Sequence, residues 1–190
     1  MSRVTRRSLL AALAVAASGC IGGDDASDDT DASEGSLSIS SLAFDDGGEI
    51  PAEYTCDGAD SSPPLRIEGV PDEAESLALV VDDPDAPDGA YVHWLLWNLP
   101  ADTRQIPQSV PHGPAVEELG GAEQATNDSG EVGYSGPCPP EGDGPHSYRF
   151  SLYAVEGELD VDAGSESGQV LGAIEDAAVA EAALTGLYGR

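Results

Sequence analysis

Short apolar segments separated by turn-forming residues are the feature of this sequence that most constrains its fold. They occupy residues 65–69, 76–82, 90–98 and 146–155, and each is bounded by proline, glycine or aspartate. Runs of this kind between such residues are typical of β-strands. Residues 37–44 add a fifth segment, in which the phase of the apolar alternation changes midway, as it does in a strand with a β-bulge. The pattern predicts a mainly β fold.

One segment near the end of the sequence has a helical pattern instead. Over residues 168–180, apolar side chains recur at spacings of three and four among alanines and acids, which indicates a helix. We expect residues 182–188 to return to strand and the long polar stretch 101–130, which shows no period, to be a loop. This order favours a mainly antiparallel sheet protein with one C-terminal helix over alternating βαβ units.

The charge of the chain limits its partners. Seven basic residues, all arginines, stand against 36 acids, so the formal net charge is −29. A chain of this charge is not expected to bind nucleic acid. The absence of lysine beside so many acids indicates a halophilic protein, because at molar salt the Debye length is about 3 Å and self-repulsion is screened. An acidic surface at ordinary salt is the alternative.

The N-terminal residues have the order of a signal peptide. The pair Arg6 and Arg7 precedes an apolar stretch over residues 11–17, and small residues precede Cys20. The arginine pair suggests twin-arginine export, and the cysteine resembles the lipidation site of a lipoprotein. The apolar stretch is shorter than the roughly 20 residues that span a bilayer, which disfavours a transmembrane helix.

These features predict three parts of the chain. Residues 1–19 are a signal peptide, 20–35 are a lipidated Cys20 followed by an acidic flexible tether, and 36–190 are the exported domain. The membrane is therefore an expected partner through the lipid anchor, on the outer face of the cytoplasmic membrane.

Two cysteines remain once Cys20 is set aside. An even remainder in an exported protein suggests a disulfide between Cys56 and Cys138. Two buried free thiols, or a catalytic Cys138, are the alternatives.

Two distant runs carry most of the side chains with recognisable chemistry. Residues 83–87 read Asp-Pro-Asp-Ala-Pro and are followed by His93; residues 136–140 read Gly-Pro-Cys-Pro-Pro and are followed by His146 and Tyr148. Proline stiffens such loops. Two imidazoles and the Tyr148 hydroxyl would donate to an anion, while Asp83 or Asp85 would fix an imidazole tautomer. The third histidine, His112, has no such neighbours.

Strand alternation predicts which side chains share a face with each histidine. His93 should lie with Leu95 and Trp97, opposite Val92, Trp94 and Leu96. His146 should lie with three apolar or aromatic residues, namely Tyr148, Phe150 and Leu152.

Other chemistries remain open for the same residues. His93, His146 and an aspartate could hold zinc, although no HExxH or CxxC spacing supports a metal. The His and Asp cluster could act as a phosphoester hydrolase or lyase. An interaction module, of the protease- or kinase-inhibitor kind, would instead use the 101–130 loop. No cofactor motif is present among the familiar ones.

With these motifs, the chain resembles the phosphatidylethanolamine-binding protein family, and within it the bacterial and archaeal Raf-kinase-inhibitor-like proteins. The matching motifs are Tyr54 to Gly58, Ser61 to Leu65, Asp82 to Pro87, His93-Trp94, Asn98 to Pro100, Asn127-Asp128, Tyr134 to Pro140, His146 to Tyr153 and Ala182 to Tyr188.

The resemblance implies two packed antiparallel sheets and a pocket for phosphate, acetate or a phosphorylated head group. The implied pocket residues are Asp83, Asp85, His93, Pro139, His146 and Tyr148, with backbone from Gly136 and Pro137. It also implies a cis Ala86–Pro87 bond. The family usually has arginine where this chain has Ser147.

The leading hypothesis is thus a lipid-anchored binding protein for a small anionic or phosphorylated ligand. Regulation of a partner protein, which the sequence does not identify, is a further expectation.

Overall fold

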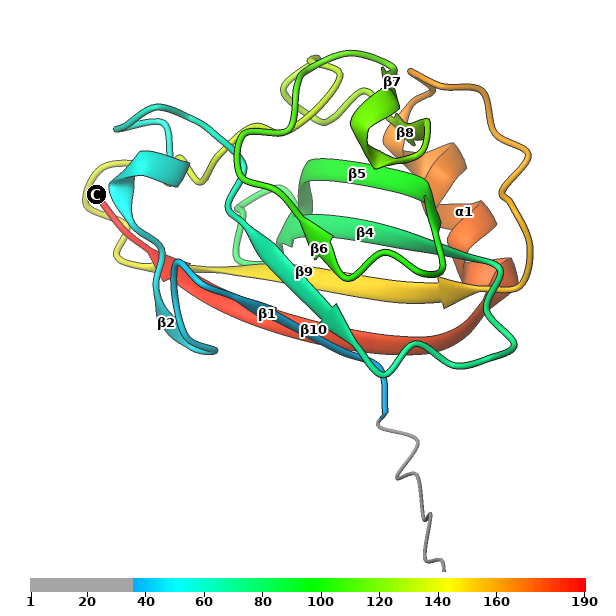
Figure 1. The fold of residues 1–190 in the computed structure, drawn as a ribbon. Coiled ribbons are helices and arrows are strands. Elements are labelled where there is room, and N and C mark those ends of the chain that lie inside the picture. The colour runs from blue at the N-terminus through cyan, green and yellow to red at the C-terminus, as the bar shows by residue number, and fades with distance from the viewer. Residues whose placement is uncertain (1–35) are drawn as a thin grey trace, which may run out of the picture. The chain divides into compact units, whose positions relative to one another are not determined.

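A computed structural model describes residues 36–190. The predicted signal peptide, Cys20 and the tether lie outside the described residues. The fold is mainly β, as predicted, with two sheets and one α-helix, α1 (Ser167–Ala177) (Figure 1). Within residues 36–190, no helix is both long and apolar enough to cross a membrane.

The larger sheet has seven strands in the order β2-β10-β9-β4-β5-β8-β7. Their bounds are β2 Gly48–Glu49, β4 Ser76–Asp83, β5 Tyr91–Pro100, β7 Ala115–Val116, β8 Ala122–Gln124, β9 His146–Val155 and β10 Ala178–Tyr188. Neighbouring strands are antiparallel except β2 and β10, which pair in parallel over two residue pairs.

The smaller sheet has three antiparallel strands, β1 (Ser38–Ser41), β3 (Leu65–Glu68) and β6 (Gln105–Ile106). Two 3₁₀ turns, Ala52–Tyr54 and Glu117–Leu119, complete the regular structure. In Figure 1 the small sheet covers one face of the large sheet, and α1 covers the other.

Each face of the large sheet carries its own apolar core. The face toward the small sheet buries Leu79, Trp94 and Phe150 against Ile39 and Ile67. The other face carries a smaller cluster of Ala78, Val80, Val92, Leu95 and Trp97 with Val170 and Ile174 of α1. Because both faces are covered, every residue of the central strand β4 is buried.

A bulge in β5 changes the expected alternation of its side chains. Val81 pairs with Trp94, but the next residue, Asp82, pairs with Val92, so His93 is an extra residue on β5. Leu95 and Trp97 lie in the core beneath α1, whereas the His93 ring packs against Tyr148 of the opposite core. The prediction that His93 shares a face with Leu95 and Trp97 was therefore wrong, because a bulge shifts the phase.

The same shift moves Val92 into the core beneath α1, away from Trp94 and Leu96 with which it was expected to lie. On β9 no shift occurs near the histidine. Tyr148, Phe150 and Leu152 lie in one core cluster, as the alternation predicts.

Three element boundaries differ from expectation. The first strand ends at Ser41, whose side chain accepts a hydrogen bond from the Ala43 amide, so the chain turns and Leu42 is exposed. The 101–130 segment is not a plain loop, since β6, β7 and β8 lie within it. The helix ends at Ala177, because Ala178 already pairs with Val155 of β9.

The expected cis Ala86–Pro87 bond was also wrong, because the described residues contain no cis peptide bond. The chain reverses there through Gly89 instead. Its amide donates to the Ala86 carbonyl at 3.2 Å, and its φ of 112° suits glycine.

Candidate functional site

Three adjacent strands bring the predicted site residues to one edge of the large sheet. β4 lies between β5 and β9 and is antiparallel to both, so its end meets their beginnings. Asp83 is the last residue of β4, His146 is the first residue of β9, and His93 lies near the start of β5. The two histidines, more than 50 residues apart in sequence, therefore approach each other from either side of Asp83.

A cavity of about 250 Å³ opens at this edge. Six of the eight predicted binding residues line it, namely Asp83, His93, Gly136, Pro139, His146 and Tyr148. Asp85 and Pro137 do not. The sequence prediction missed six further lining residues, which are Ala86, Pro87, Tyr91, Ser135, Cys138 and Pro140. Tyr91 could have been found, because it lies two residues before His93 and its ring packs on that imidazole, with the ring centres 4.9 Å apart.

The bulge that holds His93 is supported by a loop of the chain. The Val92 amide donates to the Asp128 carboxylate at 2.8 Å, and the Asp128 amide donates to the Val92 carbonyl at 3.0 Å. The His93 carbonyl accepts from the Ser135 amide and from the Asn127 side chain. These bonds satisfy backbone groups that the bulge removes from the strand pairing.

Both imidazoles use Nδ1 to hold their orientation. His93 Nδ1 lies 2.7 Å from the Ser135 carbonyl, and His146 Nδ1 lies 2.8 Å from Asp83 Oδ2. Since both partners can only accept, each Nδ1 carries a proton. Neither Nε2 has a hydrogen bond within residues 36–190. When neutral, these Nε2 atoms accept; when protonated, they donate to an anion.

Both imidazoles are buried, and their surroundings differ. Burial lowers the pKa of His93, an effect that the Ser135 carbonyl and the charges of Asp83, Asp128 and Asp60 only partly oppose. His93 is therefore easier to keep neutral than a free imidazole.

Asp83 and Asp85 have different tasks. Asp83 is 4% exposed, and both of its oxygens accept: Oδ1 from the Asp85 amide at 2.9 Å and Oδ2 from His146. Asp85 instead accepts from the Ser147 amide at 2.8 Å, and that bond lowers the pKa of its carboxyl group. Asp85 thus attaches the proline-rich turn to the start of β9 without lining the cavity.

The hydroxyl of Tyr148 is the least satisfied polar group of the cavity. It is fully buried, and no group among the described residues meets hydrogen-bond geometry with it, although the Asp83 carboxylate and the Cys138 amide lie near enough to shift its pKa. Burial, and then the charge of Asp83, raise the pKa of this phenol well above its usual value. The hydroxyl is therefore a neutral donor at any physiological pH. An unpartnered buried donor of this kind costs about 1–3 kcal/mol.

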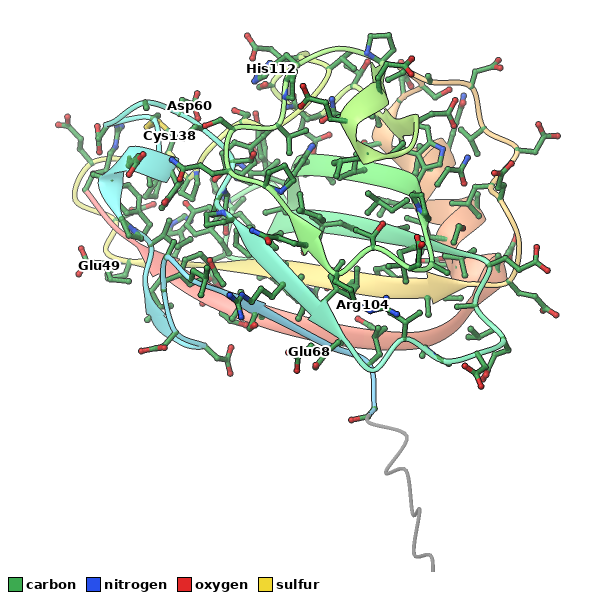
Figure 2. The ribbon with its side chains drawn as sticks, in the orientation of Figure 1. Glu49, Asp60, Glu68, Arg104, His112 and Cys138 are labelled. Carbon is green, nitrogen blue, oxygen red and sulfur yellow. A yellow bond between two sulfur atoms is a disulfide. The ribbon has the colours of Figure 1, made fainter. Side chains whose placement is uncertain are left out.

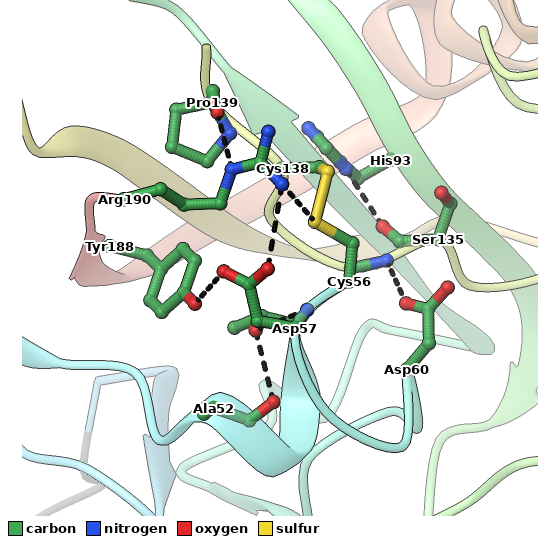
Figure 3. The surroundings of a disulfide bond; sticks show 12 residues. Ala52, Cys56, Asp57, Asp60, His93, Ser135, Cys138, Pro139, Tyr188 and Arg190 are labelled. Atoms are coloured by element: carbon green, nitrogen blue, oxygen red, sulfur yellow. Dashed lines mark hydrogen bonds and ion pairs between the residues drawn. A yellow bond between two sulfur atoms is a disulfide. The ribbon is translucent and has the colours of Figure 1, made fainter. Parts of the chain in front are cut away.

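The second run of the sequence forms the opposite wall. The Gly136 amide donates to Asp60 Oδ1 at 2.6 Å, and a Cβ at this position would lie 2.5 Å from the Tyr54 carbonyl oxygen, so only glycine fits. The Cys56 amide donates to the Pro137 carbonyl. A disulfide joins Cys56 to Cys138 across 82 residues of sequence (Figure 3). Cys138 is therefore not a free nucleophile.

Arg190, which the sequence reading did not connect with the site, lies against this wall. Its Nε donates to the Pro139 carbonyl at 2.9 Å, and its Nη1 lies 3.4 Å from Asp57 and 3.6 Å from Cys56 Sγ (Figure 3). Arg190 reaches the site because Tyr188, two residues earlier, pairs with His146 at the start of β9.

The remaining histidine takes no part in the cavity. His112 is about half exposed and lies 3.9 Å from Glu131 at the surface of the molecule (Figure 2). Within residues 36–190, no group of three or more histidine, cysteine or acidic residues is arranged to hold a metal ion.

Comparison with known protein families identifies a match over most of the described residues. Residues 40–189 match the family described as phosphatidylethanolamine-binding protein. A UPF0098 protein of Methanothermobacter thermautotrophicus is 46% identical over 154 residues, which cover 81% of this chain and 99% of that protein.

A second relative and one solved structure extend the comparison. The Mycobacterium tuberculosis protein named "Putative lipoprotein LppC" is 41% identical, with 80% of this chain and 72% of that protein covered. The crystal structure of Escherichia coli YbcL, described as a member of the mammalian PEBP family, superposes with a TM-score of 0.77. It is 31% identical, and the match covers 82% of this chain and 99% of YbcL.

The two aspartates of the turn should respond differently to the same change. An amide has one oxygen, so in Asp83→Asn either one of the two donors loses its acceptor or His146 changes tautomer, and both outcomes lose the hydrogen bond to a charged carboxylate. We expect the free energy of unfolding to fall by about 1–3 kcal/mol. Asp85→Asn keeps an acceptor for the Ser147 amide at an exposed position and should cost clearly less than Asp83→Asn. Denaturant unfolding of both variants measures this; equal losses would contradict the assignment.

Proposed function

The chain belongs to the phosphatidylethanolamine-binding protein family, and on that premise we propose that it binds a small phosphorylated or otherwise anionic ligand in the cavity between His93 and His146. The main support for this proposal is the Tyr148 hydroxyl, a donor that is buried at the cavity and makes no hydrogen bond among the described residues. Buried polar groups are nearly always hydrogen-bonded, so an orphan donor facing a cavity indicates a missing acceptor.

The donors around the cavity suit an oxyanion. Protonated Nε2 atoms of His93 and His146 and the Tyr148 hydroxyl supply three donors; the Ser135 carbonyl and Asp83 hold the two imidazoles, and the His93 ring packs on Tyr148. Asp83 balances the His146 imidazolium, whose Nε2 also lies 4.0 Å from Asp143 Oδ2, so the positive charge offered to the anion comes mainly from the His93 imidazolium. The site therefore takes up protons when it binds an anion.

The rim of the cavity suits an organic substituent. Tyr91, Pro87 and Pro140 contribute aromatic and apolar surface beside the polar donors. A volume of about 250 Å³ lies below the usual range for drug-sized ligands, which favours a small headgroup over a large molecule.

We also propose that Cys20 carries a lipid that anchors the exported domain to the membrane. The order of residues 1–20 supports this, as does the name of the mycobacterial relative.

The Tyr148→Phe variant tests the binding proposal while preserving the fold. Loss of one donor should weaken binding of inorganic phosphate about tenfold. The ligand-free protein should be no less stable, because the deleted hydroxyl has no partner. Titration calorimetry at molar salt measures the affinity, with Tyr153→Phe on the other face of β9 as the control. Equal phosphate affinity in wild type and Tyr148→Phe would refute the proposal.

The pH dependence of anion binding follows from the imidazole tautomers. Sulfate, whose charge is constant between about pH 5 and 8, should bind more tightly as pH falls, because Nε2 donates only when protonated. Burial lowers the pKa of His93, so the increase in sulfate affinity that comes from protonation of His93 should continue below about pH 6.5. His93→Gln should abolish this part of the increase, and His112→Gln should leave it unchanged. Affinity that is flat or rises with pH would contradict the mechanism.

The anchor has a separate test. In a host that processes lipoproteins, the wild-type protein should be found in the membrane fraction and Cys20→Ser in the soluble exported fraction. A Cys20→Ser protein that stays with the membrane would show that another feature holds it there.

A further inference from the structure

The disulfide between Cys56 and Cys138 is asymmetric in its exposure. Cys138 is exposed and lines the cavity, whereas Cys56 is partly buried on the 54–58 turn behind it. A small molecule that enters the cavity can therefore reach one of the two cysteines more easily than the other.

The charge around the two sulfurs is asymmetric as well. Arg190 Nη1 lies 3.6 Å from Cys56 Sγ (Figure 3). Within residues 36–190, no basic side chain donates a hydrogen bond to Cys138 Sγ, whereas Arg190 donates one to Cys56 Sγ. Asp57 shares the same Nη1 at 3.4 Å, and Tyr188 donates to the other oxygen of that carboxylate. A guanidinium beside a cysteine sulfur favours the thiolate form.

From these two asymmetries, we infer that Cys138 Sγ is the site at which a small external thiol opens the disulfide, with Cys56 as the leaving group. The incoming thiolate forms a new S–S bond with Cys138 Sγ. The Cys56–Cys138 bond breaks, and its electron pair leaves on Cys56 Sγ as a thiolate beside Arg190. The external sulfur is oxidised and Cys56 is reduced, with no further reactant. Exchange is faster when the leaving thiolate is the more stable one.

The wall of the cavity has other attachments that remain after the bond opens. The Cys56 amide still donates to the Pro137 carbonyl, and the Gly136 amide still donates to Asp60. Cys56 therefore stays close to Cys138, so its thiolate can attack the mixed disulfide and restore the original bond. The site is a reversible thiol-exchange site in the wall of the cavity, distinct from anion binding.

The direction of the exchange can be read by mass spectrometry. The exported Cys20→Ser protein, which keeps only Cys56 and Cys138, is treated briefly with 2-mercaptoethanol, an uncharged small thiol. The reaction is quenched with N-ethylmaleimide. We expect the singly opened protein to carry the mercaptoethanol adduct on Cys138 and the N-ethylmaleimide adduct on Cys56, in at least a tenfold excess over the reverse. Equal amounts, or an excess of the reverse, would overturn the proposal.

Substitution of Arg190 separates charge stabilisation from mere tethering of the wall. Arg190→Gln should slow the opening about fivefold, and Arg190→Lys should stay within about twofold of wild type. If Arg190 only tethers Pro139, its loss should loosen the wall and speed the opening, which would contradict the role assigned here. Arg104→Gln is the matched control, because that guanidinium contacts only the Ala101 and Thr103 carbonyls.

Discussion

The extra residue in β5 determines which side of the large sheet receives the His93 imidazole. Without the bulge, His93 would continue the row of Leu95 and Trp97 beneath α1, where it would meet an apolar core. With the bulge, it lies against Tyr148 and faces the same cavity as His146. The Asn127 and Asp128 loop supplies the hydrogen bonds that the bulged backbone lacks. A loop far along the chain thus fixes the geometry of the cavity.

The negative charge of the chain is compatible with an anion site. Screening at molar salt weakens the repulsion between a bound anion and a distant carboxylate. Groups in direct contact with the anion keep most of their electrostatic interaction with it. The titratable side chains that line the cavity are two imidazoles, two phenols and the Asp83 carboxylate, which is already paired with His146. A second carboxylate, that of the exposed Asp143, lies 4.0 Å from His146 Nε2. The formal charge of −29 therefore describes the surface of the molecule better than it describes the cavity.

Residue patterns predicted the strands and the two runs that form the cavity because those features are local. The long strands β4, β5 and β9 were found within two residues of their ends, and the proline-rich runs marked both walls. The bulge at His93 could not be predicted, since it depends on partners at Asn127, Asp128 and Ser135. The position of Arg190 was missed for a similar reason, because it follows from the pairing of β10 with β9. Contacts between distant segments are what a single sequence leaves out.

A crystal structure with inorganic phosphate would show whether an anion binds at the three donors. We expect phosphate with its oxygens within hydrogen-bond distance, about 2.7–3.2 Å, of the Tyr148 hydroxyl and both Nε2 atoms. Phosphate bound elsewhere on the molecule, with water alone beside Tyr148 in a cavity of unchanged shape, would contradict it.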